Sequence, residues 1–126
     1  MAVVHETEMR TIIAQAVLDQ IDNGTGGYLL FEDGTGASPT EIARIDFAAT
    51  AGTVTGALLT FTLGGGISDT SPANAGTIVQ ASIFESDDTK ILDCTAGTSA
   101  DITISSATIS TTDTVTLTAL TYTAPT

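Results

Sequence analysis

The stretch AQAVLDQIDNGTGGYLLFE, from Ala14 to Glu32, contains the point at which the spacing of the apolar residues changes. Before this point, apolar residues recur every three or four positions, as they do along one side of a helix. After the glycine-rich NGTGG the spacing becomes two, which is typical of strands, and it does not change back. The chain therefore predicts one N-terminal helix followed by a β domain.

The helix is predicted over residues 8–22, after an N-terminal arm of residues 1–7. Thr7 is a suitable N-cap, Glu8 lies in the first turn, where the helix dipole favours an anion, and Asn23-Gly24 supplies a left-handed stop. An apolar stripe follows one side of this helix: Met9, Ile12, Ile13, Ala16, Val17 and Ile21. The stripe covers either the sheet of its own chain or a neighbouring subunit, and the sequence leaves both open.

Residues 27–126 predict about seven short strands, spaced about ten residues apart. The expected strands are Tyr28–Glu32, Glu41–Phe47, Ala57–Leu63, Thr77–Glu85, Lys90–Cys94, Ala100–Ser105 and Thr114–Thr123. Short strands separated by Gly, Asp and Ser turns are typical of an antiparallel β-sandwich or a partly closed barrel. A chain of 126 residues has room for one such domain, which would span residues 1–126.

The last predicted strand, TVTLTALTYT, places threonine at nearly every second position. Threonine suits the water-facing side of a sheet because its branched Cβ fits a pleated strand and its hydroxyl bonds to water. The alternation has a fault, because Val115, Leu117 and Ala119 share one face whereas Leu120 and Tyr122 fall on the other. Either a bulge shifts the phase, or both faces are covered, as in a strand that contacts another subunit.

The net charge is −12, with only three basic residues, Arg10, Arg44 and Lys90. Nucleic acid and anionic membrane surfaces are attracted by clustered Lys and Arg, so neither is an expected partner. The sequence has no apolar run of membrane-spanning length. Its first residues lack a basic segment followed by an apolar one, so we expect the protein to be used without Sec-type secretion.

Side chains that could perform chemistry are sparse. The lone His5 lies in the arm, where a catalytic triad would be poorly anchored, and one His with one Cys cannot complete a zinc site. Cys94 ends an apolar run, and beside Asp93 it lacks the basic surroundings of a reactive thiol. We therefore expect no enzyme activity, no catalytic residues, no cofactor and no metal.

Two acidic stretches allow a functional interpretation beside a structural one. ESDDT, with Glu85, Asp87 and Asp88, could bind calcium, but it lacks the ligand spacing of an EF-hand and is favoured as a β-turn. DGTG, residues 33–36, resembles part of an aspartic protease motif in altered order and is explained by turn chemistry. The sequence also leaves open a catalytic pair of carboxylates like that of a glycosidase, although the chain has no Trp and only two Tyr to hold a sugar.

Most of the chain resembles a family of small virion proteins of tailed bacteriophages. The resemblance is carried by a short helix that ends in an Asp- and Gly-rich stop, AQAVLDQIDNGTGG, and by the strand and turn YLLFEDGTGASP. It continues through AGTIVQASIFESDDTKILDCTAGTSADITISSATISTTDTVTLTALTYTAP, in which SDDT and TTDT replace glycine-containing turns and Cys94 replaces a common glycine. The family has no catalytic motif, so the resemblance assigns no active-site residue.

The resemblance implies a decoration, or cement, protein that binds the outer surface of the icosahedral phage head and stabilises contacts between capsomers. It implies the major capsid protein as partner, a homo-oligomer (a trimer in preference to a dimer), synthesis in the bacterial cytoplasm and a final place in the virion. The expected interface residues are Val3, Val4, Met9, Ile12, Ile13, Val17, Leu120 and Tyr122. The alternatives are a tail or head–tail connector protein, and a non-catalytic carbohydrate- or calcium-binding module for host adsorption.

Overall fold

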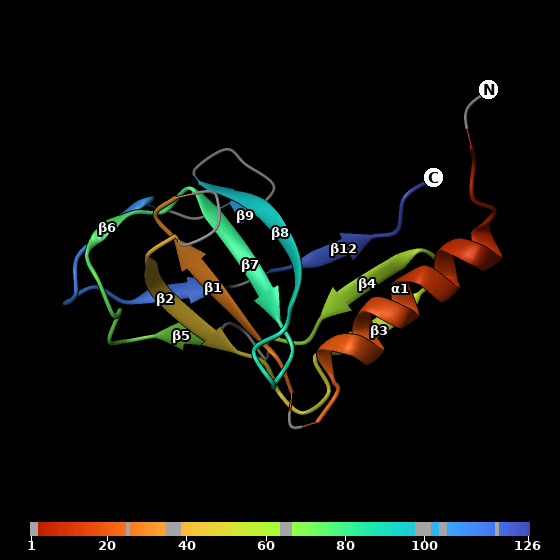
Figure 1. The fold of residues 1–126 in the computed structure, drawn as a ribbon, viewed down its shortest axis with the longest axis horizontal. Coiled ribbons are helices and arrows are strands. Elements are labelled where there is room, and N and C mark those ends of the chain that lie inside the picture. The colour runs from red at the N-terminus through yellow and green to blue at the C-terminus, as the bar shows by residue number, and fades with distance from the viewer. Residues whose placement is uncertain are drawn as a thin grey trace.

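The computed structural model of the protein describes residues 3–24, 26–34, 39–63, 67–97, 102–103, 106–117 and 119–126. Within these residues the fold is mostly β with one helix, all but one of the strand pairings are antiparallel, and no sheet closes into a barrel (Figure 1). The elements are α1 (Thr7–Ile21), β1 (Tyr28–Glu32), β2 (Glu41–Asp46), β3 (Gly52–Thr55), β4 (Leu58–Phe61), β5 (Ile67–Asp69), β6 (Gly76–Thr77), β7 (Gln80–Phe84), β8 (Lys90–Gly97), β9 (Ile102–Thr103), β10 (Thr108–Ile109), β11 (Val115–Leu117) and β12 (Thr121–Thr123).

The helix forms at the predicted place, but its start differs from the prediction. Glu6 is the N-cap residue and makes no side-chain capping bond, so the prediction of Thr7 as N-cap was wrong. Thr7 is instead the first helical residue, and its carbonyl accepts a hydrogen bond from the Thr11 hydroxyl. After the helix, Gly24 has φ +95°, a left-handed conformation that costs glycine little.

The largest sheet has the strand order β2-β1-β7-β8-β9, in which β8 and β9 form the one parallel pair among the described strands. With the two-stranded pairs β5–β11 and β6–β10 it makes up the region that we call the body. The strand predicted over residues 77–85 is interrupted, because β6 ends at Thr77 and β7 begins at Gln80. The strand predicted to end at Cys94 continues as β8 to Gly97.

A three-stranded sheet, β12-β4-β3, extends to one side of the body, and α1 packs on one of its faces (Figure 1). We call α1 and these three strands the wing. A two-residue turn joins β3 to β4, and its first residue, Gly56, has φ +60°. Such a tight hairpin turn requires a positive φ, which glycine accepts without strain.

The fault in the predicted last strand has a different origin from the two that the sequence allowed. The segment forms two strands, of which β11 pairs with β5 in the body and β12 pairs with β4 in the wing. Val115 and Leu117 are buried in the first strand, and Leu120 is buried just before the second, whereas Ala119 is exposed. The buried face changes because the chain passes from one sheet to another.

Strands β3, β5 and β10 were not predicted. Parts of several predicted features lie outside the described residues: Met1 and Ala2 of the arm, Thr35 and Gly36 of DGTG, Ala100, Asp101, Ile104 and Ser105 of one expected strand, and Thr118 of the last one.

One hydrophobic core joins body and wing. Leu18 and Ile21 of α1 belong to the same buried cluster as Leu59 of β4 and Phe31 of β1.

At 15 residues α1 is shorter than a bilayer span requires, and no other described segment forms a helix long and apolar enough to cross a membrane.

Candidate functional site

The outer face of α1 carries large apolar side chains in contact with water. Met9 is 47% exposed and Ile12 is 56% exposed, whereas Ala14 and Ile21 are 0% exposed against the wing sheet. The face that packs on the sheet is therefore rotated from the predicted stripe and includes Leu18. The rotation is possible because apolar residues occupy more than half of the helix circumference, so the spacing alone does not fix which side faces inward.

The eight predicted interface residues do not lie on one surface. In the arm, Val3 and Val4 are exposed, as are Met9 and Ile12 on α1. The other four are less accessible: Ile13 is partly buried, Leu120 is buried, and Val17 of α1 and Tyr122 of β12 pack against the core. The apolar surface open to a partner thus comprises the arm and the outer face of α1.

Side-chain hydrogen bonds fix α1 at both ends. Near its start, the Arg10 guanidinium donates from Nε and Nη2 to the carbonyl oxygen of Ala124, at 3.3 and 3.1 Å. After its end, a carboxylate oxygen of Asp22 accepts the Ala51 N–H at 2.8 Å. These bonds join the helix to the C-terminal segment and to the start of β3, so the exposed stripe is held on a fixed support.

The end of α1 also contacts the acidic turn after β7. The buried Glu85 carboxylate accepts hydrogen bonds from Gln20 and from Asn23, the second at 3.3 Å. In the turn, Asp87 accepts the Thr89 N–H at 3.0 Å. The carboxylates of the ESDDT stretch, for which a β-turn was favoured over a calcium site, are therefore used in separate structural contacts. Within the described residues, no three His, Cys, Asp or Glu side chains are placed to hold a metal ion.

In the body, two of the three basic residues stack on aromatic rings. The Arg44 guanidinium lies 3.7 Å from the centroid of the Tyr28 ring, and the Lys90 ammonium lies 5.8 Å from that of Phe84. Between them, Tyr28 and Phe84 stack with centroids 5.0 Å apart. This row crosses β2, β1, β7 and β8, and cations over ring faces stabilise it by electrostatic attraction.

The Tyr28 hydroxyl at the centre of this row donates a hydrogen bond of 2.6 Å to Asp88. Burial, this hydrogen bond and the negative charge of Asp88 raise the pKa of Tyr28 to about 12, although the positive charge of Arg44 acts in the opposite direction. The tyrosine is consequently a neutral donor at neutral pH.

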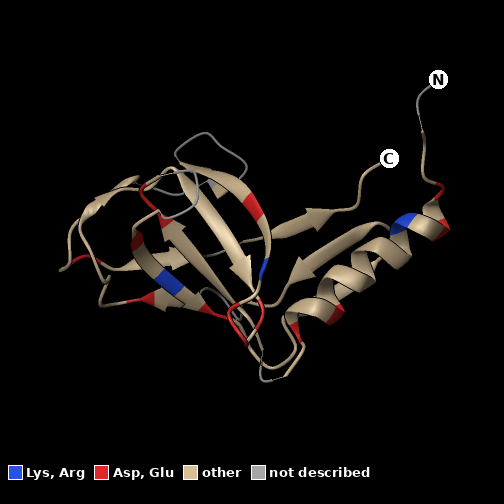
Figure 2. Ribbon diagram, viewed as in Figure 1, with Lys and Arg blue, Asp and Glu red and all other residues tan. Residues whose placement is uncertain are grey.

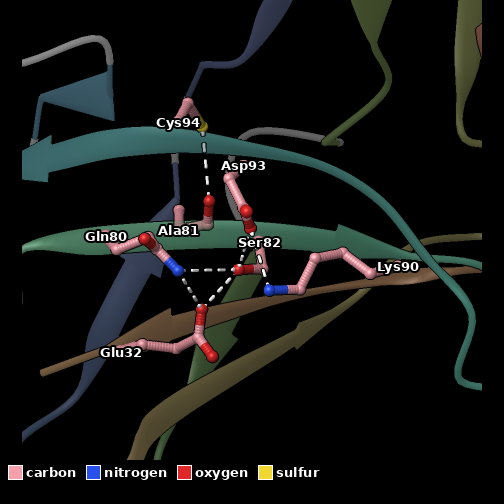
Figure 3. A network of polar contacts seen from close by, with 7 residues as sticks. All are labelled: Glu32, Gln80, Ala81, Ser82, Lys90, Asp93 and Cys94. Carbon is pink, nitrogen blue, oxygen red and sulfur yellow. Dashed lines mark hydrogen bonds and ion pairs between the residues drawn. The ribbon is translucent and has the colours of Figure 1, made fainter. Parts of the chain in front are cut away.

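A polar network occupies the same face of the body sheet (Figure 3). Ser82 is fully buried, and its hydroxyl lies between the carboxylates of Glu32 and Asp93, the latter at 2.6 Å. The Gln80 amide donates to Glu32 at 3.1 Å and to Ser82 at 3.2 Å, and Lys90 forms an ion pair of 3.2 Å with Asp93. Since Ser82 has no exposed surface, a substrate cannot reach its oxygen, and the network acts as a structural link between strands.

The pKa of Asp93 reflects this position. The hydrogen bond from Ser82 holds the pKa below its ordinary value, partial desolvation acts in the opposite direction, and Lys90 adds to the lowering. The Asp93 carboxylate is therefore ionised at neutral pH and can accept a hydrogen bond from the Ser82 hydroxyl. Cys94, on the same strand, is partly buried, with its Sγ 3.6 Å from the carbonyl oxygen of Ala81.

The face of the wing sheet opposite α1 is covered by threonine. The sequence predicted water-facing threonines in the last strand, but not a surface shared by three strands. Strand pairing places Thr121, Thr60 and Thr53 in one row across the three strands. A second row contains Thr123, Leu58 and Thr55, and every residue of both rows is exposed. The signal in the sequence is a Thr-x-Thr pattern that recurs in separate segments, and it becomes a surface only when the segments pair.

Comparison with models of protein families gave no match, and neither did comparison with curated proteins or with solved structures.

Proposed function

We propose that the protein is a decoration protein that binds the outer surface of a tailed-bacteriophage head and stabilises contacts between capsomers. The observation that carries the proposal is the exposed apolar surface formed by the arm and the outer face of α1. Large apolar side chains gathered on a rigid element mark a surface for contact with another protein. We propose the major capsid protein as the partner of this surface, in agreement with the resemblance of the sequence to small phage virion proteins.

The charge of the chain supports the outer side of the shell as the place of binding. A net charge of −12 is repelled by packaged DNA, which fills the inner side. The same charge keeps free copies apart before they bind. Attachment of a homo-oligomer through several such surfaces would add avidity to weak single contacts.

We further propose that the body is a β-sandwich. The support is that Leu29 and Phe31, on one face of the five-stranded sheet, share a core cluster with Val115 and Leu117 of β11. Two layers with their apolar faces together would form a rigid base from which the wing extends.

The proposal is tested with heads assembled from the major capsid protein that the same genome encodes. Purified protein is expected to cosediment with these heads until the sites are filled. The double variant Met9→Glu/Ile12→Glu should bind at least about tenfold more weakly, because each charge would be buried against an apolar contact. Both positions are exposed, so the variant should keep its melting temperature.

Val79→Glu is the matched control, because Val79 is also an exposed apolar residue, 41% exposed, but lies in the body between β6 and β7. It should bind heads as well as the unchanged protein does. A failure of the unchanged protein to bind heads, or equal binding by the double variant, would contradict the proposal. Saturation at a small number of copies at one vertex would favour a connector instead.

A further inference from the structure

The outer face of the wing sheet is free of charge in a strongly acidic chain. Its strands come from two segments, residues 47–68 and 114–126, that contain no Asp, Glu, Lys or Arg. Figure 2 shows the consequence, since charged residues mark α1 and the body whereas β3, β4 and β12 have none. Water-facing sheets ordinarily carry charged side chains of both signs, so a face without them needs an explanation.

The residues on this face suit a contact with an identical surface. Copies of a chain with net charge −12 repel each other wherever their acidic surfaces meet, so they approach most easily through an uncharged face. A basic partner would be drawn to the acidic surfaces instead. The charge distribution therefore favours a second copy of this chain as the occupant.

Threonine also meets a condition that a twofold axis imposes. In such an interface residue i of one copy contacts residue j of the other while j contacts i, and residues near the axis meet their own equivalents, so one hydroxyl there must donate while its equivalent accepts. A threonine hydroxyl does both, whereas two carboxylates or two ammonium groups would repel. Leu58, 39% exposed within the second row, adds an apolar contact between the hydroxyls.

We propose that two copies of the chain associate through the threonine faces of their wing sheets, packed face to face about a twofold axis. The face comprises Thr53, Thr55, Leu58, Thr60, Thr121 and Thr123. Residues on neighbouring strands are about 4.8 Å apart and alternate residues along a strand about 6.8 Å, so the face covers less than the ~800 Å² per partner of a stable complex. The association is thus weak and depends on concentration.

The position of this face separates it from the surface proposed to bind the shell. α1 covers one side of the wing sheet and the threonines lie on the other. Self-association would therefore leave Met9 and Ile12 free. A dimer differs from the trimer that the resemblance favours, so the stoichiometry by itself decides between them.

Sedimentation velocity over a range of concentrations, in the absence of phage heads, tests the proposal. The unchanged protein should convert from monomer to dimer, and added NaCl should strengthen the association because it screens the repulsion between acidic copies. Thr60→Asp, at the centre of the face, should raise the dimer dissociation constant at least about tenfold, because equal charges would meet across the axis. Thr77→Asp, an exposed strand position in the body, should leave it unchanged.

Circular dichroism and thermal melting establish whether each variant folds. If Thr60→Asp does not fold, Thr121→Asp is a second variant in the same row. The proposal would be overturned if the unchanged chain were a monomer at every concentration or a trimer. It would also be overturned if Thr60→Asp and Thr121→Asp dimerised as strongly as the unchanged chain. Head binding is measured separately, with the monomeric Thr60→Asp variant, which keeps the outer face of α1. The proposals of self-association and of head binding can therefore fail independently.

Discussion

The body and the wing use polar side chains in opposite ways. In the body, Glu32, Gln80 and Ser82 are buried and bond to one another across neighbouring strands. In the wing, the polar side chains of the sheet are threonines that face water, and the interior against α1 is apolar. Buried hydrogen bonds specify which strands pair and in which register, whereas an uncharged exposed face leaves a surface open for contact. This difference is the basis for proposing a structural role for the polar side chains of the body and self-association for those of the wing.

The largest expected effect comes from the packing of the body. Phe31 is 0% exposed in β1, at the middle of the core, and Phe31→Ala should lower the free energy of unfolding by about 3–5 kcal/mol. Leu59 is also 0% exposed, but it lies in the thinner wing, and Leu59→Ala should cost about 2–3 kcal/mol. Urea unfolding measures both values. A larger loss for Leu59→Ala would reverse the ranking of the two regions.

The polar network of the body gives the next largest effect. Ser82→Ala removes the hydroxyl between two carboxylates and should cost about 1–3 kcal/mol, because the hydrogen bond to Asp93 and the buried contact with Glu32 are lost together. Ser68→Ala is the control, since its hydroxyl bond to Thr116 is exposed and its loss should change stability by less than about 0.5 kcal/mol. Equal effects of the two substitutions would mean that the buried network contributes no more to stability than an exposed hydrogen bond.

The same substitution changes the response to acid. The pKa of Asp93 is lowered in the folded protein, so its ionised form stabilises the fold above its ordinary value of 3.8, and this contribution is lost as the pH falls through the folded-state pKa. Removing Ser82, the largest cause of the lowering, should raise the pKa of Asp93. NMR titration of the Asp93 side chain measures the shift, and an unchanged pKa would show that Lys90 alone sets it.

The sequence predicts those parts of the fold in which local pattern and tertiary packing agree. Tyr28–Glu32 is β1 with the predicted bounds, because its continuous apolar run is flanked by glycines on one side and DG on the other. β3 was missed because Gly52 and two threonines leave Val54 as its single large apolar residue. Its partner strand, not its own sequence, makes it a strand.

The candidate surfaces follow the same rule. The apolar residues of the arm and α1 were identified from their chemistry, but Met9 and Ala14 differ in burial only because the wing sheet contacts one side of the helix. The threonine face joins Thr53 and Thr121, which are distant in sequence and become neighbours through β4. Such pairing between distant segments is not contained in the spacing of either one.

A smaller effect is expected where the wing is joined at the two ends of the chain. Arg10→Ala removes both hydrogen bonds to Ala124 and should cost about 1–2 kcal/mol. Gln15→Ala, on the exposed side of α1, should change stability by less than about 0.5 kcal/mol. Hydrogen exchange should show faster opening of the first turns of α1 and of β12 in Arg10→Ala, with β1 unaffected. Faster exchange throughout the body would show that the wing does not open separately.

The smallest expected effect is a gain in stability at the start of the wing. Glu6 has φ −68° and ψ 160°, the extended conformation of an N-cap residue, yet its side chain makes no capping bond. Glu6→Asp keeps the charge and shortens the side chain so that it can accept the N–H of the second or third helical residue, which should add about 0.5–1 kcal/mol. Glu8→Asp makes the same chemical change inside the first turn, where no cap forms, and should give no gain. Thermal unfolding compares the two variants. If Glu6→Asp were no more stable than Glu8→Asp, the first turn of α1 would not limit the stability of the wing, and its attachment through Arg10 would be the weaker point.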